Sequence, residues 1–164
     1  MTFSLLGHRR SRRRTLPVVD YSTPRAHEIS DELLGATPLM VLLVESDDAL
    51  AGQLRNALPK SEFEITRCST GREALKCLLA TNYDLILCDM VMPGFPGDMF
   101  YRAVERVRPS LCRRFLSLMT RGDTSPVHDF VRSIRGLVIW KGSEPHDIYQ
   151  AVKAVSKMPA AQMS

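Results

Sequence analysis

The sequence lacks any apolar run long enough to cross a bilayer, because a membrane-spanning helix needs about 20 consecutive apolar residues. It also lacks the layout of a secretory signal, in which positive charges precede an apolar stretch of about 7–15 residues. Here the apolar start, residues 1–6, is short and comes before the arginines. We therefore expect no membrane segment and a cytoplasmic protein.

Cysteine is scarce, and its spacing excludes the common metal motifs. The four cysteines stand at positions 68, 77, 88 and 112, and none of the intervals between them is that of a zinc or iron–sulfur site. Cys88 lies in an apolar run that is typical of a buried strand. We therefore expect reduced thiols with a structural role.

An excess of positive charge is missing from most of the chain, although the formal net charge is +4. Residues 15–164 carry a net charge of −1, because the first 14 residues hold Arg9, Arg10, Arg12, Arg13 and Arg14. A nucleic-acid surface needs Lys and Arg spread over one face of the fold. We therefore expect the globular part to bind no nucleic acid. The arginine cluster either binds nucleic acid or acidic surfaces or, as we favour, belongs to a flexible leader.

No internal repeat or low-complexity segment divides the chain, and 164 residues suit one domain with flanking segments. With 45% hydrophobic and 24% charged residues, the composition is that of a soluble globular protein. We expect a flexible basic leader over residues 1–38, one domain over residues 39–156 and a short C-terminal tail over residues 157–164. No attached output domain is expected.

From residue 39 onward, short apolar runs alternate with longer segments of helical periodicity, which is typical of a parallel sheet covered by helices. Strands are expected over residues 40–44, 63–65, 85–88, 115–119 and 137–140. A helix is expected after each strand. Five strands alternating with five helices predict an α/β fold, a flavodoxin-like doubly wound parallel sheet of order 2-1-3-4-5.

Two helix starts carry capping signals. Thr70 and Glu73 have the spacing of a capping box, and the helix that follows should bury an apolar stripe that includes Leu79. Ser125 followed by Pro126 predicts an N-cap and a first helical position.

Polar side chains follow four of the expected strands. Glu45 follows the first, Asp89 the third, Thr120 the fourth and Lys141 the fifth. Ligands of such sheets bind outside the carboxyl ends of the strands, at the switch point between the first and third strands. Carboxylates beside a hydroxyl and an ammonium suit a Mg²⁺ ion and phosphoryl oxygens.

The order and spacing of these motifs resemble those of the receiver domain of two-component response regulators. The similarity rests on Leu42–Leu50 (LLVESDDAL), Tyr83–Pro93 (YDLILCDMVMP), the strand end at Thr120, and Lys141. Within the second segment, Asp89–Pro93 matches the D-x-x-M-P pattern of the family. The sequence that closes the fourth strand is similar to receivers attached to hybrid histidine kinases, which favours relay over transcription.

The resemblance implies a role in phosphorelay signal transduction. Asp89 would be the phosphoacceptor, taking a phosphoryl group from a histidine kinase or phosphotransfer protein, and Thr120 and Lys141 would bind that group. Mg²⁺ would be held by Glu45, Asp89 and the backbone carbonyl of Val91, with Ser46 as a weakened position. The signal would pass to a downstream protein target by contact, and a homodimer is possible.

Three positions depart from the family pattern. Ser46 stands where receivers carry a second acid, so Mg²⁺ affinity should be lower. Asp47 could replace that acid only through a local shift in register. Gly142 replaces the proline that usually follows the lysine, and Val138 replaces an aromatic three residues before it. Trp140, beside the lysine, is either an interaction anchor or simple packing.

Three functions remain open. The first is the phosphorylatable receiver, and the second is a degenerate receiver-like binding module that acts without phosphorylation. The third, a small phosphatase of related fold, needs an acid two residues after the nucleophile, where this sequence has Val91. We therefore do not expect an enzyme. The sequence names neither the kinase nor the target.

Overall fold

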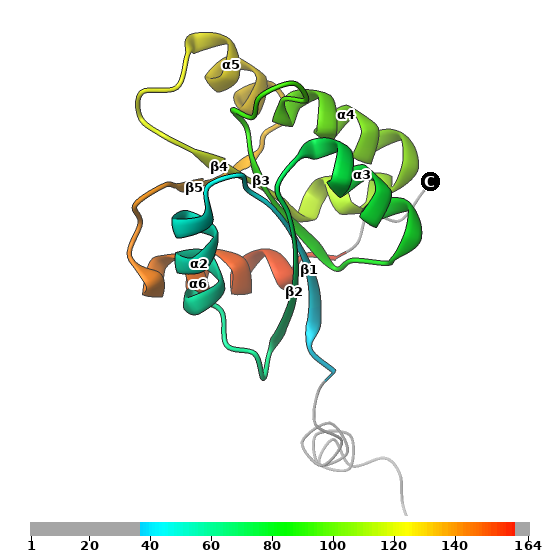
Figure 1. Ribbon diagram of the computed structural model, residues 1–164, viewed down its shortest axis with the longest axis vertical. Helices are drawn as coiled ribbons and strands as arrows, with labels where there is room; N and C mark the ends of the chain where they lie inside the picture. Colours follow the sequence, from blue (N-terminus) through cyan, green and yellow to red (C-terminus); the bar gives the residue numbers. More distant parts are fainter. Residues whose placement is uncertain (1–36, 160–164) are drawn as a thin grey trace, which may run out of the picture. The chain divides into compact units, whose positions relative to one another are not determined.

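The computed structural model describes residues 37–159, which contain a five-stranded parallel sheet of order β2-β1-β3-β4-β5 (Figure 1). The expected strand order is thereby confirmed, as is the α/β fold. The strands are β1 (Leu39–Val44), β2 (Phe63–Cys68), β3 (Leu85–Asp89), β4 (Phe115–Met119) and β5 (Leu137–Trp140). Most of the expected leader and the end of the expected tail lie outside the described residues.

Burial explains the strand order. All residues of β3 and β4 are buried, whereas β2 and β5 contain half-exposed positions. Strands covered on both faces need continuous apolar sequence, and edge strands do not. The apolar runs of β3 and β4 therefore take inner positions, with β3 beside β1 and β4 between β3 and β5.

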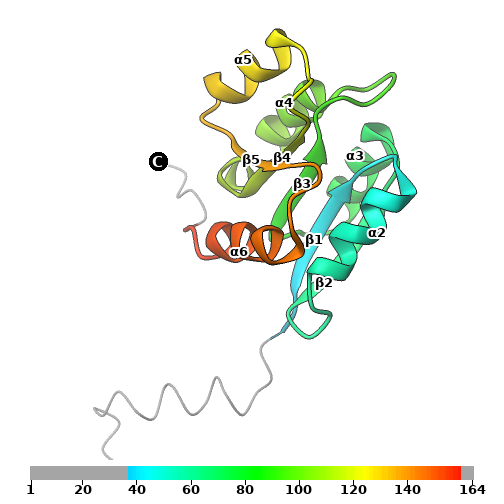
Figure 2. The ribbon, with the colours of Figure 1, turned by 90° about the vertical axis from the view of Figure 1, so that its left-hand side faces the viewer.

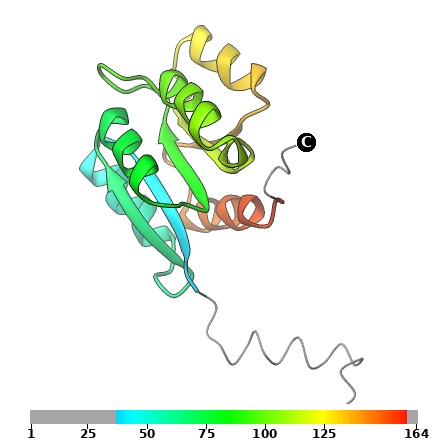
Figure 3. The same ribbon diagram turned by 90° about the vertical axis from the view of Figure 1, so that its right-hand side faces the viewer.

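Helices cover both faces of the sheet. On one face lie α2 (Asp48–Ala57) and α6 (Pro145–Ser156) (Figure 2). They bury Leu54 and Val152 in one core cluster. The other face carries α3 (Gly71–Ala80), α4 (Gly97–Val107), the 3₁₀ helix η1 (Pro109–Arg114) and α5 (Ser125–Ser133). Figure 3 shows α3 and α4 in front of the sheet. The helices of this face share the second core cluster. No helix in residues 37–159 is long and apolar enough to span a membrane.

The helix starts differ in detail from the sequence-based expectation. The Thr70 side chain accepts the Glu73 N–H as predicted, but the Glu73 carboxylate binds Ser69, one residue before the cap. The predicted cap at Ser125 is wrong, because the N-cap of α5 is Thr124 and Ser125 is already helical. Pro126 therefore occupies the second helical position, where its missing N–H also costs no hydrogen bond.

Leu79 is the clearest error in the expected core. Its side chain is 62% exposed, although its spacing places it near the stripe of Leu75 and Leu78. Leu78 is fully buried, so the inward face of α3 ends there and Leu79 lies beyond its edge. The sequence analysis also did not predict η1, which connects α4 to β4.

Candidate functional site

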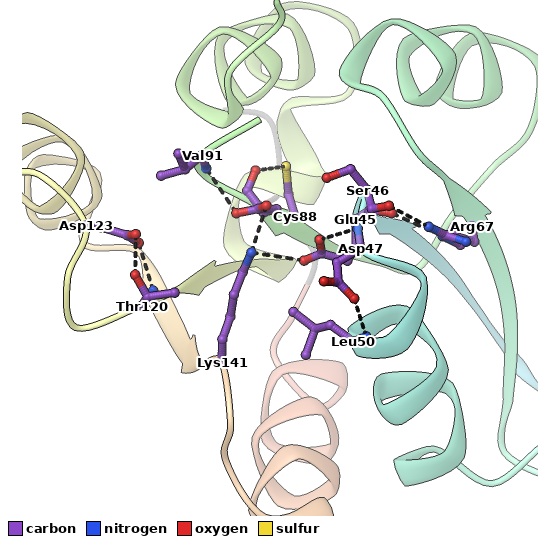
Figure 4. Close-up of polar contacts among 11 residues, drawn as sticks. Glu45, Ser46, Asp47, Leu50, Arg67, Cys88, Val91, Thr120, Asp123 and Lys141 are labelled. Atoms are coloured by element: carbon purple, nitrogen blue, oxygen red, sulfur yellow. Dashed lines mark hydrogen bonds and ion pairs between the residues drawn. The ribbon is translucent and has the colours of Figure 1, made fainter. Parts of the chain in front are cut away.

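The side chains of Asp89 and Glu45 lie together at the carboxyl ends of β3 and β1, the predicted switch point. Asp89 is 3% exposed and Glu45 is 1% exposed. The Nζ atom of Lys141, which follows β5, lies 2.8 Å from Oδ2 of Asp89 and 3.2 Å from Oε2 of Glu45 (Figure 4). Three of the four polar residues predicted at the strand ends therefore meet in one crevice.

Each carboxylate is also bound by a backbone amide. The N–H of Val91 donates to Oδ1 of Asp89 at 3.0 Å, and the N–H of Asp47 donates to Oε1 of Glu45 at 2.9 Å. Oε2 of Glu45 is buried and accepts no hydrogen bond. The charged group beside it is the Lys141 ammonium, at 3.2 Å. Two carboxylates thus share one cation, and the crevice keeps a net charge of −1.

The environment keeps Lys141 charged. Burial by itself would lower the pKa of Lys141, but the hydrogen bond and charge of Asp89 and the charge of Glu45 raise that pKa above the ordinary lysine value. An ammonium held in this way stabilises negative charge that forms nearby.

The thiol of Cys88, the residue before Asp89 in β3, packs in the core. It is fully buried and donates to the carbonyl oxygen of Asp89 at 3.2 Å. Burial, together with the charges of Asp89 and Glu45, raises the pKa of Cys88 well above its ordinary value. Cys88 is therefore a neutral thiol, which agrees with the expected structural role.

Gly142 shapes the turn that carries Lys141. The N–H of Lys141 donates to the carbonyl of Met119 at 2.7 Å, and the next residue, Gly142, has φ +87°. Residues 37–159 contain no cis peptide bond. Proline could not take this place, because its ring fixes φ near −65°. The departure at Gly142 thus reflects a different turn, built on left-handed backbone.

Thr120 is not drawn into the crevice. Its hydroxyl donates to Oδ1 of Asp123, and its N–H donates to Oδ2 of the same carboxylate at 2.8 Å. Figure 4 shows this pair apart from Lys141, on the other side of the ammonium from Glu45. The sequence places Thr120 at the correct strand end, but the acid three residues later holds its hydroxyl.

Arg67 on β2 is a residue that the sequence analysis missed. Its Nε donates to the carbonyl of Glu45 and its Nη2 to the carbonyl of Ser46, each at 3.1 Å, while Nη1 pairs with Asp48. One guanidinium thus fixes the turn between β1 and α2 that carries Glu45. An arginine on an edge strand usually faces solvent, so its sequence position gave no signal.

Asp47 does not replace the missing acid. Its Oδ1 accepts the N–H of Leu50 at 2.8 Å, which makes Asp47 the N-cap of α2. The neighbouring Ser46 is exposed. The register shift that would aim Asp47 into the crevice is absent.

The donor set fits a Mg²⁺ ion in part. Glu45 and Asp89 supply two carboxylates, and one oxygen of Glu45 is buried without a hydrogen bond. Mg²⁺ is commonly bound through one or two carboxylates and several waters. However, residues 37–159 hold no group of three His, Cys, Asp or Glu side chains placed to bind a metal, and Ser46 contributes no charge.

Comparison with known proteins identifies the family to which this sequence is similar. Residues 41–153 match the family model of the response regulator receiver domain. The regulatory protein VanRB of Enterococcus faecalis is 31% identical over 64 residues, which are 39% of this chain and 29% of VanRB. The transcriptional regulatory protein SrrA of Staphylococcus aureus is 26% identical over 116 residues, 70% of this chain and 46% of SrrA.

A solved structure shows the same fold. The chemotaxis protein CheY4 of Vibrio cholerae superposes with a TM-score of 0.63 at 21% identity, covering 73% of this chain and 99% of that chain. The chain spans less than half the length of the two curated relatives it matches.

Proposed function

The chain belongs to the response regulator receiver domain family, and from this we propose that it accepts a phosphoryl group on Asp89 and signals by protein contact. The donor is a histidine kinase or a phosphotransfer protein, and the recipient of the signal is a downstream protein target. The proposal covers residues 39–156 and assigns no catalytic turnover to the domain.

One observation carries the proposal: a buried carboxylate at a strand end contacts a charged lysine in an anionic crevice. Asp89 is 3% exposed, and its Oδ2 lies 2.8 Å from Lys141 Nζ. An acid that served only to cap a turn would not need this partner. Taking an ammonium partly out of water is costly unless an opposite charge is paired with it.

The chemistry follows from this arrangement. An oxygen of Asp89 attacks phosphorus, an O–P bond forms, the N–P bond to the donor histidine breaks, and the histidine nitrogen keeps the electron pair. Lys141 then transfers its ion pair from the carboxylate oxygen to the phosphoryl oxygens. The N–H of Val91 keeps its hydrogen bond to Oδ1 of Asp89 and orients the nucleophile.

Glu45, Asp89 and the carbonyl of Val91 would hold Mg²⁺, with Ser46 as a neutral and weaker position. A bound Mg²⁺ ion neutralises charge on phosphoryl oxygens. Within the chain itself, Glu45 is a second anionic partner of Lys141, at 3.2 Å from its Nζ atom, beside Asp89 at 2.8 Å.

Thr120 takes part only after it leaves Asp123. Both carboxylate oxygens of Asp123 accept hydrogen bonds from Thr120 in the unphosphorylated structure. A phosphoryl group on Asp89 would offer the hydroxyl a competing acceptor with a greater charge. Exchange of Thr120 between these acceptors is the conformational step we propose for signalling.

A degenerate binding module is the second candidate. It is favoured by the uncharged Ser46 and by the hydrogen bonds that hold Thr120 outside the crevice. In that case the fold would bind its protein target constitutively, and Asp89 and Lys141 would form a structural ion pair.

Intact mass spectrometry after incubation with acetyl phosphate, with and without Mg²⁺, distinguishes these functions. We expect a Mg²⁺-dependent gain of one phosphoryl group, and no gain in Asp89→Asn. If the wild type gains nothing at high Mg²⁺ but Ser46→Asp does, the crevice is disabled at Ser46 and the binding-module function replaces the receiver function.

A further inference from the structure

Two cysteines outside the acidic crevice lie in direct contact. The Sγ atoms of Cys68, the last residue of β2, and Cys77, in the second half of α3, are 3.4 Å apart. Both thiols are free. The proposed function does not use either side chain.

The strand–helix connection holds the two thiols in place. Only Ser69 and Thr70 separate β2 from α3, and the Thr70 cap and the Glu73–Ser69 hydrogen bonds fix that turn. Cys77 faces inward from α3 and packs against the core cluster that contains Cys68. The contact between the two sulfur atoms is therefore set by the backbone of β2 and of α3.

The two thiols differ in access to solvent. Cys68 is 4% exposed, whereas Cys77 is half-buried. Burial, followed by the hydrogen bond and charge of Cys77, raises the pKa of Cys68 to about 12. Because the Cys68 thiol is buried and hard to ionise, the more accessible Cys77 is the group that meets an external oxidant.

We propose that Cys68 and Cys77 form a redox modification site that closes to a disulfide by exchange with a low-molecular-weight disulfide. The Cys77 thiolate attacks one sulfur of the oxidant, forms a mixed disulfide and releases one thiolate. Cys68 then loses its proton, attacks the sulfur of Cys77 and releases the second thiolate. The protein loses two electrons and two protons, and the oxidant becomes two thiols.

Closure acts next to the acidic crevice. The sulfurs must approach from 3.4 Å to about 2.05 Å, through rotation of the two side chains and any shift of α3 against the end of β2 that the bond requires. The carbonyl of Cys68 accepts the N–H of Glu45 at 3.0 Å, and Arg67 holds the Glu45 turn. Oxidation therefore changes the strand end beside Glu45 without consuming Asp89.

The other two cysteines serve as internal controls. Cys88 is fully buried and its thiol is bonded to the carbonyl of Asp89. Cys112 lies in η1, and its pKa is raised by burial, which outweighs the hydrogen bond from Tyr101 that lowers it. Among the described residues no other pair of thiols is in contact.

The test uses the full chain, reduced and then incubated with glutathione disulfide. We expect an intact-mass loss of two hydrogen atoms, reversed by dithiothreitol, and a peptide map that links Cys68 to Cys77. Cys112→Ser should behave as the wild type. Cys68→Ser should stop at a stable glutathione adduct on Cys77, and Cys77→Ser should form no intramolecular disulfide.

The wild-type peptide map decides the question even if a variant folds poorly. A wild type that carries only glutathione adducts, or only disulfides through Cys88 or Cys112, would overturn the proposal. Asp89→Asn should form the Cys68–Cys77 disulfide at the wild-type rate. The disulfide can therefore be tested even if the chain accepts no phosphoryl group.

Discussion

The ammonium of Lys141 lies 2.8 Å from the carboxylate of Asp89, although β4 separates their strands in the sheet. The contact is possible because both residues stand at carboxyl ends of parallel strands, and the Lys141 side chain is long enough to reach across one strand. Glu45 is a second anion on the same ammonium, so the three side chains together carry one unbalanced negative charge. The stability and the chemistry of the crevice both depend on this imbalance.

Replacing Lys141 by methionine should destabilise the fold. Breaking a buried ion pair costs about 3–5 kcal/mol, and the 20% exposure of the Lys141 side chain reduces that cost. We expect the free energy of unfolding at pH 7 to fall by about 2 kcal/mol, measured by urea denaturation. An unchanged free energy would mean that water already screens the two carboxylates.

Asp89→Asn is the matched control and should act in the opposite direction. It leaves one carboxylate, Glu45, for one ammonium, so the charges balance. We expect the free energy of unfolding to stay equal or to rise by up to about 1 kcal/mol. This result would also show that loss of phosphorylation in Asp89→Asn does not come from unfolding.

The pH dependence of the Lys141 contribution has a defined sign. The pKa of Lys141 is raised in the folded state, so its stabilising effect is complete below the unfolded pKa of about 10.4. It is lost as pH rises through the folded value. The difference in unfolding free energy between wild type and Lys141→Met should therefore be constant at pH 7–9 and shrink above about pH 10.4. Urea titrations at each pH measure it, and a constant difference at pH 11 would contradict the assignment.

The sequence predicts the sheet and the meeting of Glu45, Asp89 and Lys141, because both depend on buried runs and on which residue ends each strand. It does not predict where a side chain turns after leaving the strand. Thr120 is held by Asp123, and the Glu45 turn is held by Arg67 from another strand. Those contacts depend on loop conformation and strand register, which single-residue patterns do not encode.

Ser46→Asp should strengthen Mg²⁺ binding. The added carboxylate supplies the charge that the crevice lacks, and ligand charge sets the affinity for hard cations, so we expect an approximately tenfold lower Kd. Isothermal titration calorimetry measures it. Ser46→Asn, which adds an oxygen without charge, should bind as weakly as the wild type.

Asp47→Asn tests the neighbouring acid. Asp47 caps α2 through the N–H of Leu50, and asparagine is an equally good cap. Mg²⁺ affinity and stability should both stay close to wild type. A marked loss of Mg²⁺ affinity would show that Asp47 is a ligand after all.

Arg67→Lys should loosen the Glu45 turn. Lysine keeps the charge but cannot bind the two carbonyls and Asp48 together, so we expect the free energy of unfolding to fall by about 1–2 kcal/mol. Asp48→Asn removes only an ion pair with a 90% exposed carboxylate and should cost less than about 0.5 kcal/mol. Equal losses in the two variants would assign the stabilisation to the exposed pair instead of the backbone contacts.

Gly142→Ala separates backbone strain from packing at the turn that carries Lys141. A Cβ atom at Gly142 or at Gly52 would meet no atom within 4 Å. Gly142 has φ +87°, whereas Gly52 lies within α2. The same added methyl should therefore destabilise at Gly142 by about 1 kcal/mol and stabilise at Gly52 by up to about 1 kcal/mol. Thermal denaturation of both variants gives the signs. If Gly142→Ala were neutral, the turn would tolerate other backbone conformations, and the position of Lys141 would depend on its ion pairs with Asp89 and Glu45 rather than on the turn itself.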